Sequence, residues 1–489
     1  MNTPVRRIAI AVMAMVLLLL ANLTYVQVIK ASDYRKDPRN QRVLLAEYGR
    51  ERGQISAGGQ VLANSVPTDD RLRYQRQYSK GPAYSPVTGY YSVIYSSSGV
   101  ERAMDEVLNG SDDRLFVRRL SDLITGRDPS GGNVVLTLDP AAQQVAYDAL
   151  TSKRFAGSVV AIAPKTGEIL AMASTPSFDP NPLASHSAEV QQQAWPKLTA
   201  ADPSVLTNRA INETYPPGST FKLIDTAAAL QAGVNPDTQL TPAPQIPLPG
   251  STATLENFGG QRCGGGATVS LREAFARSCN TAFAEMVRNI GEPALREQAG
   301  KFGIGEADVT VPMAVAASAI GDIADVPSLM QSAIGQRDVR LTPLQNAMIA
   351  ATIANDGIRM SPFLVKEIQS QDLSTVDATS PDEIGRSIPA SVANTLTDLM
   401  RGSEDRTAGG GKIPGVAIAS KTGTAEHGND PKNTPPHNWY VAFAPADNPV
   451  VAIAVLVENG GDRGLDGTGG AVAAPIGRAV INAILQGRR

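Results

Sequence analysis

A long apolar run near the N-terminus sets the first constraint on how this chain can fold. From Ile8 to Ile29 the residues are mostly apolar, with a dense centre at Val12 to Leu20, and Arg6 and Arg7 come just before the run. A segment of this length can cross a bilayer as a helix. Because basic residues tend to stay in the cytoplasm, we expect residues 1–7 to form a cytoplasmic tail and the bulk of the chain to lie outside the cytoplasm.

The competing interpretation of this run is a secretory signal that is removed from the mature protein. Such a signal has a shorter apolar core and a small-x-small cleavage site. Asn22, Thr24 and Gln27 dilute the end of the run, but no A-x-A cleavage site follows closely after Leu20. The sequence therefore favours an uncleaved, single-pass anchor over residues 8–29.

Composition excludes several classes of protein. With 489 residues, of which 42% are hydrophobic and 19% charged, the chain is long enough for two or more folded domains. A net charge of -3 provides no broad basic surface for nucleic acid. The three histidines, His186, His427 and His437, form no ligand-spaced cluster, so we expect neither a metal site nor a cofactor.

Residues 30–155 differ in texture from the rest of the chain. They contain many arginines, tyrosines and short polar runs, and no candidate catalytic group. Asn133 to Leu138 predicts a strand, and Pro140 to Leu150 predicts a helix with Asp139 as its N-cap. We interpret this region as a small pedestal domain that holds the next domain away from the membrane.

Residues 156–489 are predicted to form a second domain of mixed α/β (α+β) class. Strands occur near both of its ends with helix-rich sequence between them, which indicates one sheet completed by both termini and an inserted helical lobe. The predicted strands are Ser158 to Pro164, Glu168 to Ser174, Trp439 to Pro445 and Val450 to Val457, and the last predicted helix is Ala471 to Leu485.

The first chemical motif is Ser219 to Lys222, the only S-x-x-K in the chain. Pro216 to Gly218 predict a tight turn before it, and Thr220 to Ala232 predict a helix. Residues three apart on a helix share a face, so the Ser219 hydroxyl and the Lys222 amine should be able to touch. A desolvated lysine near another cation can act as base for a serine nucleophile, and its pKa should be lowered. The alternative is an exposed polar pair at a helix start.

The second motif is Ser278 to Asn280, the only S-x-N. We expect it in a loop of the helical lobe, where Ser278 can relay a proton and Asn280 can position both substrate and lysine. Helix capping is the ordinary alternative for Ser and Asn.

The third motif is Lys421 to Thr424, which continues a strand-like run. Lys421 and Thr422 can hold a substrate carboxylate, Gly423 lets a substrate backbone lie close, and the amides of Ser219 and Thr424 can form an oxyanion hole. An ordinary strand end with a solvated lysine is the alternative. A second K-T-G, Lys165 to Gly167, precedes the serine motif and is predicted to be a turn between strands.

These motifs, in this order, resemble the penicillin-binding protein and serine β-lactamase superfamily. Gly157 to Asn181, Asn208 to Ala210 and Trp439 to Pro445 are similar to the transpeptidase domain of class B penicillin-binding proteins, and Arg52 to Ile55 resemble the start of that class's N-terminal, dimerisation-like module. Within that class, nearly the whole chain resembles the actinobacterial penicillin-binding protein A type.

The resemblance implies a membrane-anchored peptidoglycan D,D-transpeptidase of cell-wall synthesis, with a role in cell division or cell shape. Its substrate is the D-alanyl-D-alanine end of a stem peptide, and β-lactams are its inhibitors. Ser219 corresponds to the acylated nucleophile, Lys222 to the base and Ser278 to the proton shuttle. Asn280, Lys421 and the residues Thr422, Gly423 and Thr424 correspond to the substrate-binding groups. Cell-wall synthesis or division proteins are the implied partners.

Three positions depart from the family pattern. Ser420 stands where many relatives have glycine, and Tyr215 to Gly218 replace the commoner Glu-Pro-Gly. Cys279 lies inside the second motif, and Cys263 is the only other cysteine of the chain. Because the compartment should be oxidising, a disulfide that tethers the Ser278 loop is one possibility, and two free thiols are the other.

Four other functions are the alternatives to a transpeptidase. A β-lactamase needs a base for deacylation, and no acidic candidate stands out between the second and third motifs. A D,D-carboxypeptidase usually carries the serine motif nearer its N-terminus. A bifunctional synthase needs a glycosyltransferase domain, for which the pedestal is too short. A β-lactam sensor or division scaffold on the same fold remains an alternative.

Overall fold

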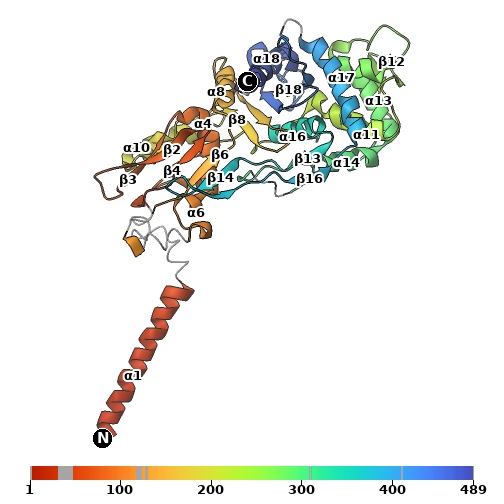
Figure 1. Cartoon of the computed structure of the whole chain (residues 1–489). Coiled ribbons are helices and arrows are strands. Elements are labelled where there is room, and N and C mark those ends of the chain that lie inside the picture. Colours follow the sequence, from red (N-terminus) through yellow and green to blue (C-terminus); the bar gives the residue numbers. More distant parts are fainter. Residues whose placement is uncertain are drawn as a thin grey trace.

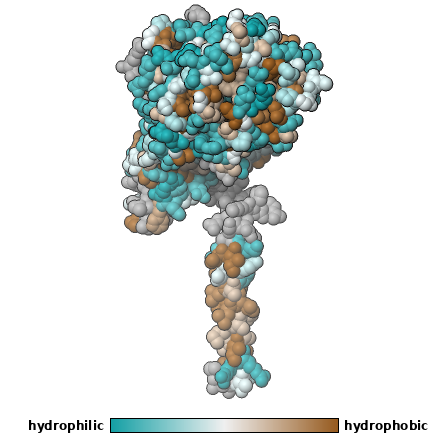
Figure 2. Space-filling view, turned by 90° about the vertical axis from the view of Figure 1, so that its right-hand side faces the viewer, coloured by the Kyte–Doolittle hydropathy of each residue, from teal (hydrophilic) through white to brown (hydrophobic). Residues whose placement is uncertain are grey.

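The computed structural model describes residues 3–30, 48–116, 124–126, 130–307, 309, 311–408 and 411–487. The first two residues of the predicted tail and residues 31–47 of the predicted pedestal lie outside these ranges. The predicted anchor is a single helix, α1 (Thr3–Thr24), continued by η1 (Tyr25–Ile29). This helix is apolar enough to cross a membrane, and the residues of its most apolar part are not buried within the protein. It forms the mostly brown stalk below the folded part in Figure 2.

The N-terminal module is built on a six-stranded sheet in the order β15-β14-β6-β1-β2-β3 (Figure 1). β1 and β6 are parallel, and the other neighbours are antiparallel. Two of these strands come from much later in the chain, so both predicted domains contribute to this sheet. The strands are β1 (Ile55–Ala57), β2 (Gln60–Pro67), β3 (Tyr74–Tyr78), β6 (Asn133–Leu136), β14 (Val365–Gln369) and β15 (Thr375–Ala378).

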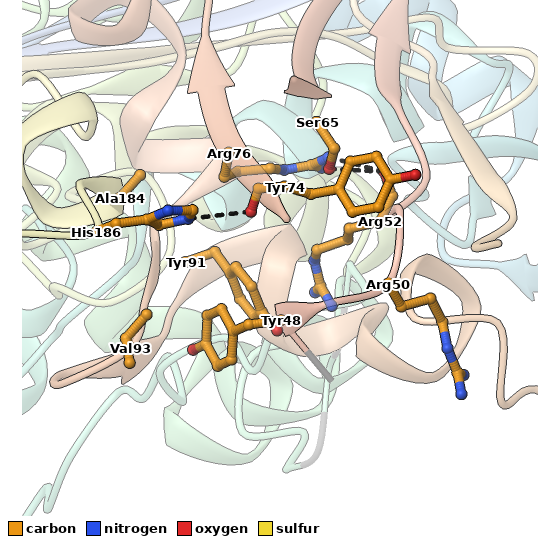
Figure 3. Close-up of a pocket in the computed structure, with 10 residues that line it drawn as sticks. All are labelled: Tyr48, Arg50, Arg52, Ser65, Tyr74, Arg76, Tyr91, Val93, Ala184 and His186. Carbon is orange, nitrogen blue, oxygen red and sulfur yellow. Dashed lines mark hydrogen bonds between the residues drawn. The ribbon is translucent and has the colours of Figure 1, made fainter. Parts of the chain in front are cut away.

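A buried ionic cluster in this module lies beside a small pocket, whose lining includes Arg52, Arg76 and Tyr91 (Figure 3). Glu101, which is fully buried, accepts from Arg52 Nε at 2.7 Å and from Arg76 Nε at 2.6 Å. The Tyr78 hydroxyl donates to the same carboxylate at 3.1 Å. The guanidinium of Arg52 also lies 4.2 Å from the centre of the Tyr91 ring. The cluster thus pairs two buried cations with a buried anion.

The second sheet has five antiparallel strands in the order β17-β18-β19-β7-β8. It joins strands from both ends of the domain, as the sequence predicted. Lys165 to Gly167 form the turn between β7 and β8, at the opposite edge of the sheet from the other K-T-G on β17. The strands are β7 (Gly157–Ile162), β8 (Ile169–Thr175), β17 (Ala419–Ala425), β18 (His437–Ala444) and β19 (Val451–Val457).

Helices cover both faces of this sheet, because its strands are apolar on both sides. Tyr440 and Ala442 of β18 pack with α8 (Pro140–Thr151) and α18 (Ala474–Gly487). Val441 and Phe443, which alternate with them, pack in the cluster that contains α16 (Pro343–Ala354). The predicted cap of α8 is confirmed, since the Asp139 side chain accepts from the amides of Ala141 and Ala142.

A helical lobe is inserted between β8 and β17. Its helices are α11 (Lys222–Gln231), α12 (Leu271–Arg277), α13 (Asn280–Ile290), α14 (Glu292–Lys301), α15 (Val326–Ser332) and α17 (Ala390–Ala408). Other helices are α4 (Gly81–Thr88), α5 (Gly99–Ala103), α6 (Asp105–Leu108), α9 (Asn181–Ala184) and α10 (Ala188–Thr199), with η2 (Asp113–Leu115), η3 (Gly218–Phe221), η4 (Phe258–Gly260), η5 (Gly461–Asp466) and η6 (Gly469–Ala473). Short strand pairs are β4 (Tyr91–Ser92) with β5 (Ser96–Ser97), β9 (Gln239–Leu240) with β12 (Val269–Ser270), β10 (Gln245–Pro247) with β11 (Thr254–Glu256), and β13 (Ile358–Met360) with β16 (Glu383–Arg386).

Candidate active site

Ser219 lies in the 3-10 turn η3, directly before α11, where the sequence predicted one continuous helix from Thr220. The turn is held from two sides: the Gly218 amide donates to Gly335 O at 2.9 Å, and Trp439 Nε1 donates to Pro216 O at 2.9 Å. Gly218 has φ +53°, and a Cβ there would lie 2.8 Å from Thr424 O. Only glycine therefore fits between the nucleophile turn and β17.

The unusual lead-in to this turn is anchored at Tyr215. Its hydroxyl donates to Glu458 Oε1 at 2.8 Å, and Arg209 Nε donates to the same oxygen at 2.8 Å. Glu458 follows the end of β19, so this contact ties the approach to Ser219 to the central sheet. Tyr215 thus has a structural role in the lead-in to the nucleophile turn.

Lys222 is fully buried and its Nζ contacts three oxygen atoms. It donates to Ser278 O at 2.8 Å, to Asn280 Oδ1 at 2.8 Å and to Ser278 Oγ at 3.3 Å. Among the described residues, Ser219 and Lys222 share no hydrogen bond, although they lie one turn apart. The predicted contact between hydroxyl and amine is therefore not made in this structure.

Ser278 connects α12 to α13 in a strained conformation. Its φ of 60° lies in the left-handed region, which is uncommon for a residue with a side chain. The following residue, Cys279, is joined by a disulfide to Cys263, with Cα atoms 5.9 Å apart. The disulfide tethers the segment that carries Ser278.

Lys421 approaches Ser278 from the opposite side, at the edge strand β17. Its Nζ donates to Ser278 Oγ at 2.9 Å and to Thr422 O at 2.9 Å. The Ser278 hydroxyl therefore lies between the two lysine amines. Lys222 and Lys421 are buried, whereas Ser219 and Ser278 are partly exposed, so the hydroxyls are accessible and the amines are shielded.

Gly423 allows a close approach that the sequence interpretation assigned to substrate. A Cβ there would lie 2.7 Å from Pro217 O and 3.1 Å from Thr220 Cγ2. The missing side chain thus lets β17 pack against the nucleophile turn itself. Thr422 and Thr424, on either side of it, are partly exposed.

The two lysine amines of the site are buried and form their hydrogen bonds without a carboxylate partner, and this determines their pKa values. The hydrogen-bond partners of both lysines given above are neutral. Burial, and then the nearby Lys421 cation, lowers the pKa of Lys222 well below its ordinary value, with Asp225 acting in the opposite direction. Burial lowers the pKa of Lys421 to about 7. Lys421 can therefore exchange protons near neutral pH, and the lowered pKa of Lys222 favours the neutral amine that a base needs.

Two supporting residues were not found from sequence. Glu404 of α17 lies behind β17, where it accepts from Ser420 Oγ at 2.5 Å and from Arg478 Nε at 2.8 Å. Asn257 accepts from the amide of Thr281, the residue after Asn280, at 3.1 Å. A lone Glu or Asn carries no sequence signal for such a role, because its partners are distant in the chain. Within the described ranges, no group of three or more His, Cys, Asp or Glu side chains could hold a metal ion.

The sequence matches known protein families and curated proteins over nearly its whole length. Residues 157–482 match the penicillin binding protein transpeptidase domain, and residues 52–134 match the penicillin binding protein A dimerisation domain. Peptidoglycan D,D-transpeptidase PbpA of Mycolicibacterium smegmatis is 60% identical over 489 residues, 99% of each chain. The protein of the same name from Mycobacterium tuberculosis H37Rv is 58% identical over 490 residues, the full length of both.

Solved structures agree with these matches. The ceftriaxone acyl-enzyme complex of penicillin-binding protein A from M. tuberculosis has a TM-score of 0.89 and 58% identity, over 90% of this chain and 100% of that chain. The penicillin G acyl-enzyme complex of the same protein has a TM-score of 0.86 and 57% identity, over 89% of this chain and 100% of that chain. The predicted fold class is confirmed.

Proposed function

The chain belongs to the penicillin-binding protein transpeptidase family, and from that premise we propose that it is a peptidoglycan D,D-transpeptidase working through an acyl-Ser219 intermediate. The observation that carries this proposal is the convergence of Lys222 Nζ and Lys421 Nζ on Ser278 Oγ, at 3.3 and 2.9 Å. The arrangement offers a base beside the nucleophile turn and a hydroxyl relay next to it.

In the acylation step, Lys222 in its neutral form accepts the proton of the Ser219 hydroxyl. Ser219 Oγ attacks the carbonyl carbon of the penultimate D-alanine and forms a tetrahedral intermediate. The proton then passes through Ser278 to the nitrogen of the terminal D-alanine, the C–N bond breaks, and an ester on Ser219 remains. An amine of a second stem peptide attacks the carbonyl carbon of this ester and loses a proton to Lys222. As the C–O bond breaks, Lys222 returns a proton to Ser219 Oγ, so that the new amide is released and both the serine hydroxyl and the neutral lysine are regenerated.

The remaining motif residues bind substrate in this proposal. Lys421 and Thr422 hold the terminal carboxylate, and Asn280 positions both the donor peptide and Lys222. The backbone amides of Ser219 and Thr424 stabilise the negative charge on the carbonyl oxygen. The close packing of η3 against β17 at Gly218 and Gly423 supports this last assignment, because it brings the neighbouring Ser219 and Thr424 near each other.

β-Lactams are proposed to acylate Ser219. The support is that penicillin-binding protein A of M. tuberculosis has solved structures as acyl-enzyme complexes with ceftriaxone and with penicillin G. The chain covers the full length of that relative.

The membrane arrangement is part of the same proposal. Helix α1 anchors the protein, Arg6 and Arg7 stay in the cytoplasm, and the folded part lies outside the cytoplasmic membrane. Proteins of cell-wall synthesis or division are the proposed partners.

The test is mass spectrometry of the detergent-solubilised protein incubated with benzylpenicillin, and separately with a D-alanyl thioester donor with and without a D-amino-acid acceptor. We expect a stable adduct on Ser219 and an acceptor-dependent product, and Ser219→Ala should give neither. A labelled Ser219→Ala protein would overturn the nucleophile assignment. An adduct without product would favour a sensor, and rapid loss of the adduct would favour a β-lactamase.

A further inference from the structure

Residues Glu256 to Cys263, named here the rim loop, are attached to three consecutive residues that follow Ser278. Cys263 forms the disulfide with Cys279. Glu256 O accepts from Asn280 Nδ2 at 3.1 Å. Asn257 Oδ1 accepts from the Thr281 amide at 3.1 Å. The segment that carries Ser278 and Asn280 is therefore bonded directly to the rim loop.

Asn257 is the most fully bonded residue of this contact. Asn257 is buried, with 6% of its surface exposed. Nδ2 donates to Ala243 O and Gln261 O at 3.0 Å each, and Oδ1 also accepts from Thr281 Oγ1 at 3.3 Å. Both ends of the amide are thus satisfied. The backbone amide of Asn257 donates to Pro244 O at 2.9 Å, which fixes the peptide bond that it shares with Glu256.

The orientation of the Asn280 amide depends on that peptide bond. Oδ1 of Asn280 accepts from Lys222 Nζ, and Nδ2 donates to Glu256 O. If Glu256 O moved away, the Asn280 Nδ2 group would lose the acceptor that fixes it, and only the bond from Lys222 Nζ would still favour this orientation of the amide. A flipped amide would present NH₂ to the Lys222 amine, which would lose an acceptor.

We propose that Asn257 is a positioning residue for the reaction: its side chain ties the Thr281 amide to Ala243 O and Gln261 O, and thereby keeps the neighbouring Asn280 amide against Glu256 O with its oxygen directed at Lys222. The inference rests on the proposed role of Lys222 as base. Among the described residues, Asn257 forms no hydrogen bond with Lys222, Ser219 or Ser278, so it acts through Asn280.

The effect on Lys222 has a definite sign. An acceptor such as Asn280 Oδ1 stabilises the protonated amine more than the neutral one. Loss of this acceptor lowers the pKa of Lys222 further and makes it a weaker base. The other titratable groups that act on Lys222 are Lys421 on β17 and Asp225 on α11, and both stay unchanged in an Asn257 variant.

The experiment measures the rate of penicillin acylation against pH for Asn257→Ala, Asn280→Ala and the double variant of the full-length protein. Each single variant should slow acylation about ten-fold and move the acid limb of the profile to lower pH. The double variant should be no slower than Asn280→Ala, because both changes remove the same contact.

Asn133→Ala is the matched control. Asn133 is also 6% exposed and also bonds backbone at both ends, to the Gln54 amide and to Ser370 O, but it lies in the six-stranded sheet. It should lower thermal stability without moving the acid limb. If Asn257→Ala does not fold, Thr281→Val removes the hydroxyl that contacts Asn257 Oδ1 at 3.3 Å and Ala243 O at 2.7 Å, keeps the Thr281 amide bond, and should give a smaller shift in the same direction.

Additive effects of the two substitutions, or an unchanged acid limb in a folded Asn257 variant, would overturn the inference while leaving the acyl-Ser219 proposal intact. Labelling of Ser219→Ala would instead overturn the proposed function. The two failures are therefore separable.

Discussion

Two regions of this molecule bury pairs of cations in opposite ways. In the N-terminal module, Arg52 and Arg76 both bond the carboxylate of Glu101. In the cleft, Lys222 and Lys421 bond hydroxyl, amide and carbonyl oxygens, none of which carries a negative charge.

The difference separates structural charge from reactive charge. Burial raises the pKa of Glu101, but Arg76 and Arg52 outweigh it and the pKa lies below its ordinary value, so the anion stays ionised and the cluster is locked. In the cleft, burial acts on the lysines without a bonded anion, and their pKa values fall toward neutrality. A buried cation with a partner stabilises a fold, whereas one without a partner becomes available for proton transfer.

The largest expected effect comes from placing a permanent positive charge at the position of Lys222, which removes the difference between the two regions. Lys222→Arg places a side chain there that stays protonated and cannot act as base. The rate of penicillin acylation should fall about 10²- to 10⁴-fold, as measured by stopped-flow labelling. Lys222→Met controls for the change in shape and should be similarly slow. Acylation within a factor of a few of the parent rate would remove Lys222 from its proposed role.

The next effect removes the anion from the N-terminal module. Glu101→Gln leaves two buried arginines without their shared carboxylate and should cost about 3–5 kcal/mol in the free energy of unfolding. Urea denaturation would measure this loss. The acylation rate of the folded fraction should be unchanged, because the cluster lies outside the cleft. A loss below about 1 kcal/mol would show that the ion pairs contribute little net stability.

The smallest effect is a difference in pH dependence. The pKa of Lys421 is about 7 in the folded protein against an ordinary 10.5, so between these values the unfolded chain binds more protons than the folded one. The free energy of unfolding should therefore rise with pH across this window, on the order of 2 kcal/mol from pH 7 to pH 9. Lys421→Met should lack this rise, which thermal unfolding at several pH values would measure. Parallel curves for the two proteins would contradict the lowered pKa.

Much of the cleft could be anticipated from sequence because its motifs are local. Ser219 and Lys222 lie within one turn, and Ser278 and Asn280 within one loop, so spacing alone predicted that each pair would act together. Alternating apolar runs likewise predicted the strands of the second sheet.

Contacts between distant residues could not be anticipated in the same way. The predicted boundary near residue 156 gave no sign that β14 and β15 would complete the N-terminal sheet, because a strand's partner is set by tertiary packing. Glu404 behind Ser420, and Asn257 beside Asn280, carry no local pattern that marks them as supports.

The sequence by itself determined the apolar anchor, the composition of the strands and the chemistry of the three motifs, since these depend on side chains and their short-range spacing. Only the tertiary structure decided that Ser278 Oγ lies between two lysines, that both lysines are buried without a bonded anion, and that Gly423 packs against the nucleophile turn. Burial and long-range proximity change pKa values and set distances, and neither property belongs to a residue until the chain has folded around it.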